Sequence, residues 1–158
     1  MKIVIPGGSG QVGTVLARAF HEHGDEVVVL SRRPQVRPWR VTTWDGVNLG
    51  AWRDEIDGCD VVINLTGRSV NCRYNARNRE EILRSRVLST KVIGEAIAKS
   101  ERPSRVWLQA STATIYAHSY DRANDEHSGM IGGGEPRRRV RGDSASRWRA
   151  RGSRRSTR

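Results

Sequence analysis

Three glycines near the amino terminus, Gly8, Gly10 and Gly13, have the spacing of the G-x-G-x-x-G pattern. In that pattern the first glycine permits a sharp turn, the second lets the backbone approach a pyrophosphate, and the third lets a helix pack on a strand. The first amides of a helix are unpaired and lie at the positive end of its dipole, so a helix start is an anion site. These glycines therefore predict a phosphate-binding loop.

The residues on both sides of the loop fit this interpretation. An apolar run at residues 3–5 predicts a strand before it, and a second strand is expected at residues 26–30. Between them, apolar residues recur at helical spacing up to Gly24, namely Val12, Leu16, Ala19 and Phe20. A nucleoside-triphosphate loop is excluded because Thr14 stands where its lysine should be. A glycine-rich turn without a ligand is the other alternative, and the flanking strand and helix favour dinucleotide binding over it.

Two arginines, Arg32 and Arg33, follow the second expected strand, and no acid occurs before Asp45. In a dinucleotide-binding fold a carboxylate at this point binds the ribose 2′-hydroxyl of NAD, whereas an arginine accommodates the 2′-phosphate of NADP. The sequence therefore favours NADP(H) over NAD(H). The alternative is that both arginines are solvated loop cations.

The elements that must position these residues alternate along the chain. Beyond residue 30 we expect strands at residues 40–44, 61–65 and 105–109, a short helix through Leu49, Trp52 and Ile56, and a long helix at residues 79–100. Leu83, Val87 and residues 94–97 are expected on one side of the long helix. This alternation predicts an α/β fold with a doubly wound parallel sheet, the Rossmann arrangement. Four tryptophans are expected to pack in its core: Trp39, Trp44, Trp52 and Trp107.

The net charge of +11 is concentrated at the carboxyl end. Residues 136–158 hold ten arginines against one acid, whereas residues 1–135 are nearly neutral, with 18 basic and 16 acidic side chains. We therefore expect one globular domain at residues 1–135 and a disordered arginine-rich tail at residues 136–158. The tail is either an arm for nucleic acid or an acidic partner, or a shifted reading frame, and we favour the second.

The remaining composition limits the class of protein. Only two cysteines occur, Cys59 and Cys72, and no apolar run approaches transmembrane length, so a cytoplasmic protein without a membrane partner is expected. The segment that contains His118, Asp121, Asp125, Glu126 and His127 has no metal-ligand spacing, and a solvated acidic loop is expected there instead of a metal site.

Four stretches, at residues 7–13, 31–33, 60–67 and 111–116, resemble motifs of the NAD-dependent epimerase/dehydratase family in the order that the family has them. This family belongs to the extended and atypical short-chain dehydrogenase/reductases. Residues 86–91 and 110–118 resemble its sugar-nucleotide-epimerase-like branch in particular. The resemblance covers residues 1–135 and implies an NAD(P)-binding Rossmann fold.

The resemblance also implies roles for individual residues. Pyrophosphate contacts would come from the glycine loop, through Gly7, Ser9, Gly10, Gln11, Val12 and Gly13. Arg32 and Arg33 would bind the 2′-phosphate, and Leu65, Thr66 and Gly67 would contact the ribose nearer the nicotinamide. Ser111 stands in the place of the family's active-site serine or threonine, and Tyr116 is a second catalytic candidate. The substrate would be a nucleotide sugar or a small carbonyl or hydroxyl compound.

The sequence departs from the family at the catalytic pair. Hydride-transferring members use Tyr-x-x-x-Lys, but neither Tyr116 nor Tyr120 has a lysine four residues later. Whether the chain is an enzyme therefore stays open. Three functions remain: an epimerase/dehydratase-like oxidoreductase domain, a non-catalytic NADP(H)-binding sensor or partner module, and a basic-tailed nucleic-acid-binding protein. We favour the first and expect no specific nucleic-acid partner.

In the family a further strand, a helix and a substrate-binding part follow the point where the resemblance stops. We therefore expect the carboxyl-terminal part of the family fold to be missing from this chain. Apolar surface and a sheet edge would then be uncovered, so we expect weak stability, self-association or no activity.

Overall fold

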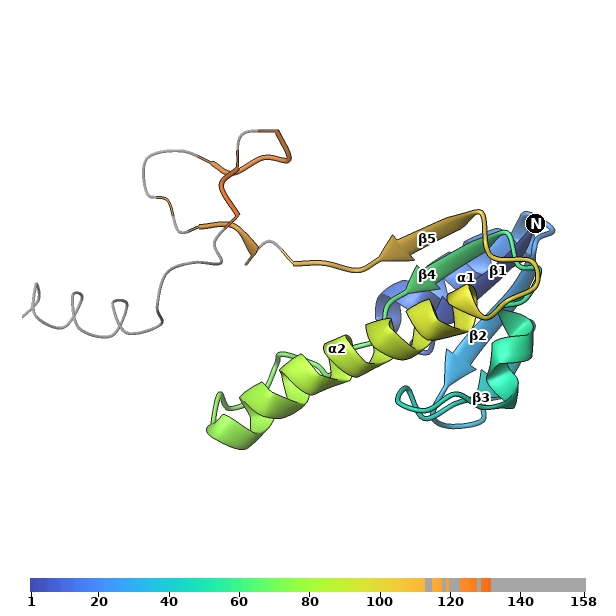
Figure 1. Cartoon of the computed structure of the whole chain (residues 1–158), viewed down its shortest axis with the longest axis horizontal. Helices are drawn as coiled ribbons and strands as arrows, with labels where there is room; N and C mark the ends of the chain where they lie inside the picture. The colour runs from blue at the N-terminus through green and yellow to red at the C-terminus, as the bar shows by residue number, and fades with distance from the viewer. Residues whose placement is uncertain (113–114, 118, 120–122, 128, 132–158) are drawn as a thin grey trace, which may run out of the picture. The chain divides into compact units, whose positions relative to one another are not determined.

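The computed structural model of the 158-residue chain describes residues 1–112, 115–117, 119, 123–127 and 129–131. The chain divides into two units, Met1–Ala110 and Ser111–Arg158. The helices and strands of the described residues belong to the first unit (Figure 1). The expected tail at residues 136–158 lies outside the described residues.

Within the described residues, five strands form one parallel sheet with the order β3-β2-β1-β4-β5. They are β1 (Lys2–Pro6), β2 (Glu26–Ser31), β3 (Arg40–Thr43), β4 (Val61–Asn64) and β5 (Val106–Gln109). Strands β2 and β3 lie on one side of β1, and strands β4 and β5 lie on its other side. The expected doubly wound sheet is therefore confirmed, and such sheets bind ligands beyond the carboxyl ends of the strands, where the order reverses.

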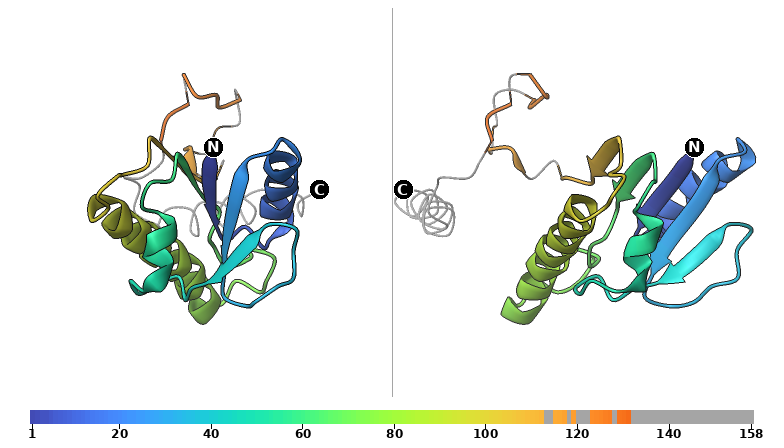
Figure 2. Two further views of the ribbon diagram at one scale, coloured as in Figure 1. Left: turned by 90° about the vertical axis from the view of Figure 1, so that its right-hand side faces the viewer. Right: turned by 45° about the vertical axis from the view of Figure 1, so that its right-hand side comes forward.

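Helices cover the two faces of this sheet. Helix α1 (Gln11–Glu22) lies on one face, and the 3₁₀-helix η1 (Ala51–Glu55) and helix α2 (Ala76–Ala98) lie on the other (Figure 2). On the α1 face, Ala17 packs with Ile5 and Val29 in one apolar cluster. On the α2 face, Ile93 packs with Val28 and other strand residues in a second cluster. Strands β1 and β2 are buried between these two layers, which explains their continuous apolar sequence.

The start of α2 differs from the prediction, which began the long helix at residue 79. The helix begins at Ala76 because Asn75 caps it: the Asn75 side chain accepts a hydrogen bond of 2.8 Å from the Asn78 backbone N–H. This Asn-x-x-Asn spacing was a start signal that the apolar periodicity alone does not contain.

The predicted apolar faces of both helices are partly wrong. In α2, Leu83 and Val87 are 62% and 54% exposed, and the buried residues lie in its second half, from Ser89 to Ala96. In α1, Val12 is 63% exposed, whereas Gly13 and Ala17 are buried. The first half of α2 extends beyond the arrowhead of β4 in Figure 1.

Three of the four tryptophans, Trp39, Trp44 and Trp52, are buried as expected. Trp107 is 40% exposed, because β5 is the edge strand and all four of its residues are exposed. The six-membered part of the Trp107 ring lies near α2, where a Cβ placed on Gly94 would be 3.3 Å from it. In the described part of the chain, no helix has both the length and the apolar character needed to span a membrane.

Candidate dinucleotide-binding site

The glycine loop connects β1 to α1 and is fixed by its own backbone. The Gly7 N–H donates to the Leu30 carbonyl of β2 at 2.9 Å, and the Gly8 N–H donates to Ile5 at 3.0 Å. Gly7 has a φ of +76°, and a Cβ there would lie 2.8 Å from the Thr66 backbone. Only glycine meets both conditions.

Gly13 and Gly10 have different surroundings. A Cβ on Gly13 would lie 2.4 Å from the Gly8 Cα, so this glycine lets α1 pack directly on the loop. A Cβ on Gly10 would meet nothing closer than the Gly7 carbonyl oxygen, at 3.7 Å, and would project into open space. Gly10 is also the N-cap of α1 and provides no side-chain hydrogen bond to its first amides. The loop therefore leaves free space directly before a helix N-terminus, as a phosphate group requires.

A cavity of about 570 Å³ opens at this loop. It is bounded by the segments that follow β1, β2, β3 and β4 and by one side of α2. Seven of the predicted cofactor residues line it: Gly7, Ser9, Gly10, Arg32, Leu65, Thr66 and Gly67. Gln11, Val12, Gly13 and Arg33 are not among the lining residues. The strand ends that the sequence assigned to one ligand thus meet around one cavity.

Arg32 stands at the end of β2 and lines the cavity, whereas Arg33 lies beside it. The Arg33 backbone N–H donates to the Ser31 hydroxyl at 3.3 Å, which closes the turn after the strand. Both arginines are exposed, and among the described residues neither guanidinium has an ion-pair partner. An unpaired guanidinium at this point is available for an anionic ligand.

The segment after β4 forms the opposite wall. The fully buried Asn64 side chain accepts from the Thr66 N–H at 3.0 Å and donates to Gln109 on β5 at 2.8 Å. The Leu65 N–H donates to the Pro6 carbonyl at 2.9 Å, which joins this wall to β1. The Thr66 hydroxyl is buried and has no hydrogen-bond partner within the described chain. A buried hydroxyl without a partner is rare unless a ligand or water completes it.

Sequence reasoning missed the wall after β3. Asp45 accepts hydrogen bonds from the Val47 and Asn48 backbone N–H groups, each at 2.8 Å, and from the Asn48 side chain at 2.7 Å. The bonds from Asn48 and Val47 lower the pKa of the Asp45 carboxyl group below its usual value. The signal in the sequence was an Asp-Gly turn directly after the third strand.

The sequence analysis also did not identify four residues of α2 that belong to the site. Glu81, Arg84, Ser85 and Leu88 line the cavity, and their spacing of three, four and seven residues places them on one helix face. This pattern mixes charged, polar and apolar residues, so a search for apolar periodicity does not detect it.

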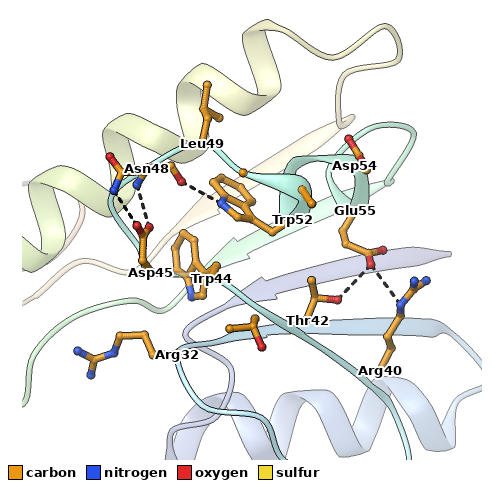
Figure 3. Close-up of a pocket in the computed structure, with 13 residues that line it drawn as sticks. Arg32, Arg40, Thr42, Trp44, Asp45, Asn48, Leu49, Trp52, Asp54 and Glu55 are labelled. Atoms are coloured by element: carbon orange, nitrogen blue, oxygen red, sulfur yellow. Dashed lines mark hydrogen bonds and ion pairs between the residues drawn. The ribbon is translucent and has the colours of Figure 1, made fainter.

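A second cavity, of about 810 Å³, lies beside the first and shares Arg32, Trp44 and Asp45 with it (Figure 3). Several of its polar groups are paired with one another. The Glu55 carboxylate accepts from the Thr42 hydroxyl and binds the Arg40 guanidinium, each at 3.1 Å, and the Trp52 ring N–H donates to the Asn48 carbonyl at 3.0 Å. These contacts fasten η1 to β3 and support the Asp45 turn.

The two catalytic candidates, Ser111 and Tyr116, belong to the second unit. Ser111 is exposed, and Tyr116 pairs with Ile131 in an isolated antiparallel bridge. Among the described residues there is no group of three metal-ligand side chains. His118 and Asp121, which belong to the acidic segment weighed as a metal site, lie outside the described residues.

Comparison with known proteins agrees with the geometry. The sequence profile of the NAD dependent epimerase/dehydratase family matches residues 3–136. The epimerase family protein SDR39U1 of Bos taurus is 32% identical over 131 residues, and the epimerase family protein YfhF of Bacillus subtilis is 30% identical over 130 residues. Both alignments cover 81% of this chain, but only 42% and 43% of the relatives.

A solved structure has a similar fold. The crystal structure of human epimerase family protein SDR39U1 with NADPH superimposes with a TM-score of 0.67 at 29% sequence identity. The superposition covers 81% of this chain and 42% of the human chain. The chain thus spans less than half the length of the relatives it matches.

Proposed function

Because the chain belongs to the NAD-dependent epimerase/dehydratase family, we propose that its first unit binds NADP(H) in the cavity at the glycine loop. The observation that carries this proposal is that the segments after β1, β2 and β4 meet around one cavity, with an unpaired arginine at the end of β2. The NADPH in the structure of human SDR39U1 supports the choice of cofactor.

Each wall of the cavity has a proposed role. The space beside Gly10 and the first amides of α1, from Gln11 to Gly13, receive the pyrophosphate. Arg32, assisted by Arg33, binds the 2′-phosphate of the adenosine half. On the other side of the glycine loop, Leu65, Thr66 and Gly67 contact the ribose nearer the nicotinamide.

Three features of the cavity fit NADP(H). A Cβ at Gly10 would project into the space that the pyrophosphate needs, which explains a glycine where the fold alone tolerates a side chain. The Thr66 hydroxyl offers a buried polar atom that a ligand hydroxyl can complete. A positively charged side chain and helix amides complement the negative charge of the ligand's phosphates.

For the reaction, we propose oxidoreduction or epimerisation of a nucleotide-sugar-like or small carbonyl or hydroxyl substrate. NADP(H), when bound, supplies or accepts a hydride in such reactions. Ser111 would hydrogen-bond the substrate oxygen, and Tyr116 is the second candidate for proton transfer. The missing Tyr-x-x-x-Lys pair favours one alternative, a non-catalytic NADP(H)-binding module, which predicts cofactor binding without turnover.

The cofactor proposal is tested by fluorescence titration of the whole chain with NADPH and with NADH. We expect tighter binding of NADPH. Arg32→Asp should lower the NADPH affinity about 10- to 100-fold, because a carboxylate that repels the 2′-phosphate replaces a guanidinium that donates a charge-assisted hydrogen bond to it. NADH affinity should be nearly unchanged.

Arg37→Asp is the matched control, because Arg37 is an exposed arginine of the same connection that lines neither cavity. It changes the net charge as Arg32→Asp does and should leave both affinities unchanged. Equal affinity of the unaltered chain for NADPH and NADH would contradict the assignment of Arg32 to a 2′-phosphate.

A further inference from the structure

Two neighbouring residues of α2 hold the cavity wall after β4: Ser85, which lines the cavity, and Arg86, which does not. The Ser85 hydroxyl accepts from the Arg68 N–H at 2.9 Å and donates to the Ile82 carbonyl at 3.0 Å. The Arg86 guanidinium donates to the Arg68 carbonyl at 3.2 Å and to the Ile82 carbonyl at 3.0 Å. Both backbone polar groups of Arg68 are therefore tied to the same turn of α2.

The contact between Arg86 and this wall is close as well as hydrogen-bonded. A Cβ placed on Gly67 would lie 3.0 Å from the central carbon of the Arg86 guanidinium. The planar group therefore lies against the backbone of residue 67, and glycine is the residue that leaves room for it. Arg86 is half-buried in this position and is not itself among the residues that line the cavity.

The sheet order places this wall relative to the rest of the site. Strand β4 lies on the opposite side of β1 from β2. Arg32 follows β2, so residues 65–68 lie across the glycine loop from it. If Arg32 binds the 2′-phosphate of the adenosine half, the wall at residues 65–68 faces the half that carries the nicotinamide.

We propose that Arg86, together with Ser85, is a positioning residue for the nicotinamide half of NADP(H). It acts by holding residues 66–68 in place and does not contact the ligand. This inference rests on the proposed function and extends it to a part of α2 that the cofactor assignment does not use. It also gives a physical reason for Arg86, the first residue of the stretch at residues 86–91 that resembles the sugar-nucleotide-epimerase-like branch.

The test compares two ligands by isothermal titration of the whole chain. NADPH occupies both halves of the site, whereas adenosine 2′,5′-bisphosphate carries only the adenosine, its 2′-phosphate and the adjacent 5′-phosphate. Arg86→Ala should weaken NADPH binding about tenfold, as expected for the loss of charge-assisted hydrogen bonds that fix the wall. The affinity for adenosine 2′,5′-bisphosphate should stay within about twofold of the unaltered chain, a shift of less than half a kcal/mol.

Further variants separate positioning from general stability. Arg86→Lys should bind NADPH with intermediate affinity, because one ammonium group replaces a guanidinium that bonds two carbonyl oxygens. Ser85→Ala removes the other bond to residue 68 and should reproduce the selective loss if Arg86→Ala fails to fold. Arg79→Ala, an exposed arginine on the same helix away from the cavity, is the control and should change neither affinity.

A ligand-free measurement accompanies the titration. In Arg86→Ala, amide hydrogen exchange at residues 66–68 should be faster than in the unaltered chain, and exchange in β1 should be unchanged. Unchanged NADPH affinity in Arg86→Ala, or an equal loss for both ligands, would overturn the inference alone. Failure of the unaltered chain to bind NADPH would instead overturn the proposed function.

Discussion

Gly10 and Gly13 lie three residues apart at the start of α1, yet a side chain would meet different surroundings at the two positions. At Gly13 it would collide with the Gly8 backbone, whereas at Gly10, which lines the cavity, it would meet only the Gly7 carbonyl oxygen, at 3.7 Å. The sequence pattern assigns both glycines to one motif. The structure separates them into a residue that the fold needs and a residue that the ligand needs.

Gly10→Ala should therefore weaken NADPH binding and spare stability, whereas Gly13→Ala should lower stability. Gly10→Ala should leave the free energy of unfolding within about 1 kcal/mol of the unaltered chain, the usual range for a cap position. It should abolish most NADPH binding. Gly13→Ala should lower the free energy of unfolding by about 1–3 kcal/mol through overpacking. Urea unfolding followed by tryptophan fluorescence, with an NADPH titration of each variant, measures both quantities. A Gly10→Ala variant with normal NADPH affinity would show that the space beside Gly10 does not hold the pyrophosphate.

Among the elements, the strands were predictable and the helix faces were not. Strands β1, β2 and β4 are short runs rich in β-branched residues and are buried between two layers. A continuous apolar run of this kind predicts a strand that is buried on both faces. Helix α2 packs on the sheet only through its second half, while its first half lines the cavity. Exposure of Leu83 and Val87 follows from this division and cannot be deduced from periodicity.

Some walls of the cavity were predictable from the sequence, and others were not. The glycine loop and Arg32 follow strands that the sequence reveals, so their place in the site was predictable. The Asp45 turn and the α2 residues from Glu81 to Leu88 reach the cavity through tertiary packing. Their sequence indicates a turn and a polar helix face, and neither feature shows which part of the fold it packs against.

The Asp45 turn should stabilise the fold at neutral pH and lose this effect in acid. Hydrogen bonds lower the folded-state pKa of Asp45 from its ordinary value of 3.8, so the stabilisation is present above that value and disappears as the pH falls through the folded-state pKa. Asp45→Ala should lower the free energy of unfolding at neutral pH and weaken NADPH binding, because the wall after β3 loosens. Urea unfolding between about pH 3 and pH 7 should show a smaller pH dependence for this variant.

Two variants control this prediction. Asp45→Asn keeps a side-chain oxygen for the two backbone N–H groups and should lose less stability than Asp45→Ala. Asp54→Ala removes an exposed carboxylate whose ion pair is with the adjacent Arg53, and should have little effect. An Asp45→Ala chain as stable as the unaltered chain at neutral pH would contradict the role of the turn.

On the scale of the whole molecule, β5 is one of the two edge strands of the sheet that the described residues form. Val106, Trp107 and Leu108 are 44%, 40% and 52% exposed, and an apolar edge strand is a template for pairing with another chain. We expect the chain to self-associate, with the apparent mass rising with concentration in sedimentation velocity. Leu108→Lys should shift the distribution toward the monomer, because a charge on an edge strand opposes pairing.

Val36→Lys is the control for self-association, since Val36 is fully exposed and lies in the connection between β2 and β3, whereas β5 is at the opposite edge of the sheet from β3. It adds the same charge and should leave the distribution unchanged. A purely monomeric unaltered chain, or an equal effect of the two lysine variants, would count against pairing through β5.

The central claim, that NADP(H) occupies the cavity at the strand ends, is tested most directly by hydrogen–deuterium exchange of the whole chain with and without NADPH. We predict slower exchange at three separate segments, residues 7–14, 31–33 and 65–68. The ten arginines in residues 136–158 offer NADPH another, purely electrostatic place to bind. Protection confined to those residues, or no protection at the three strand ends, would contradict the account.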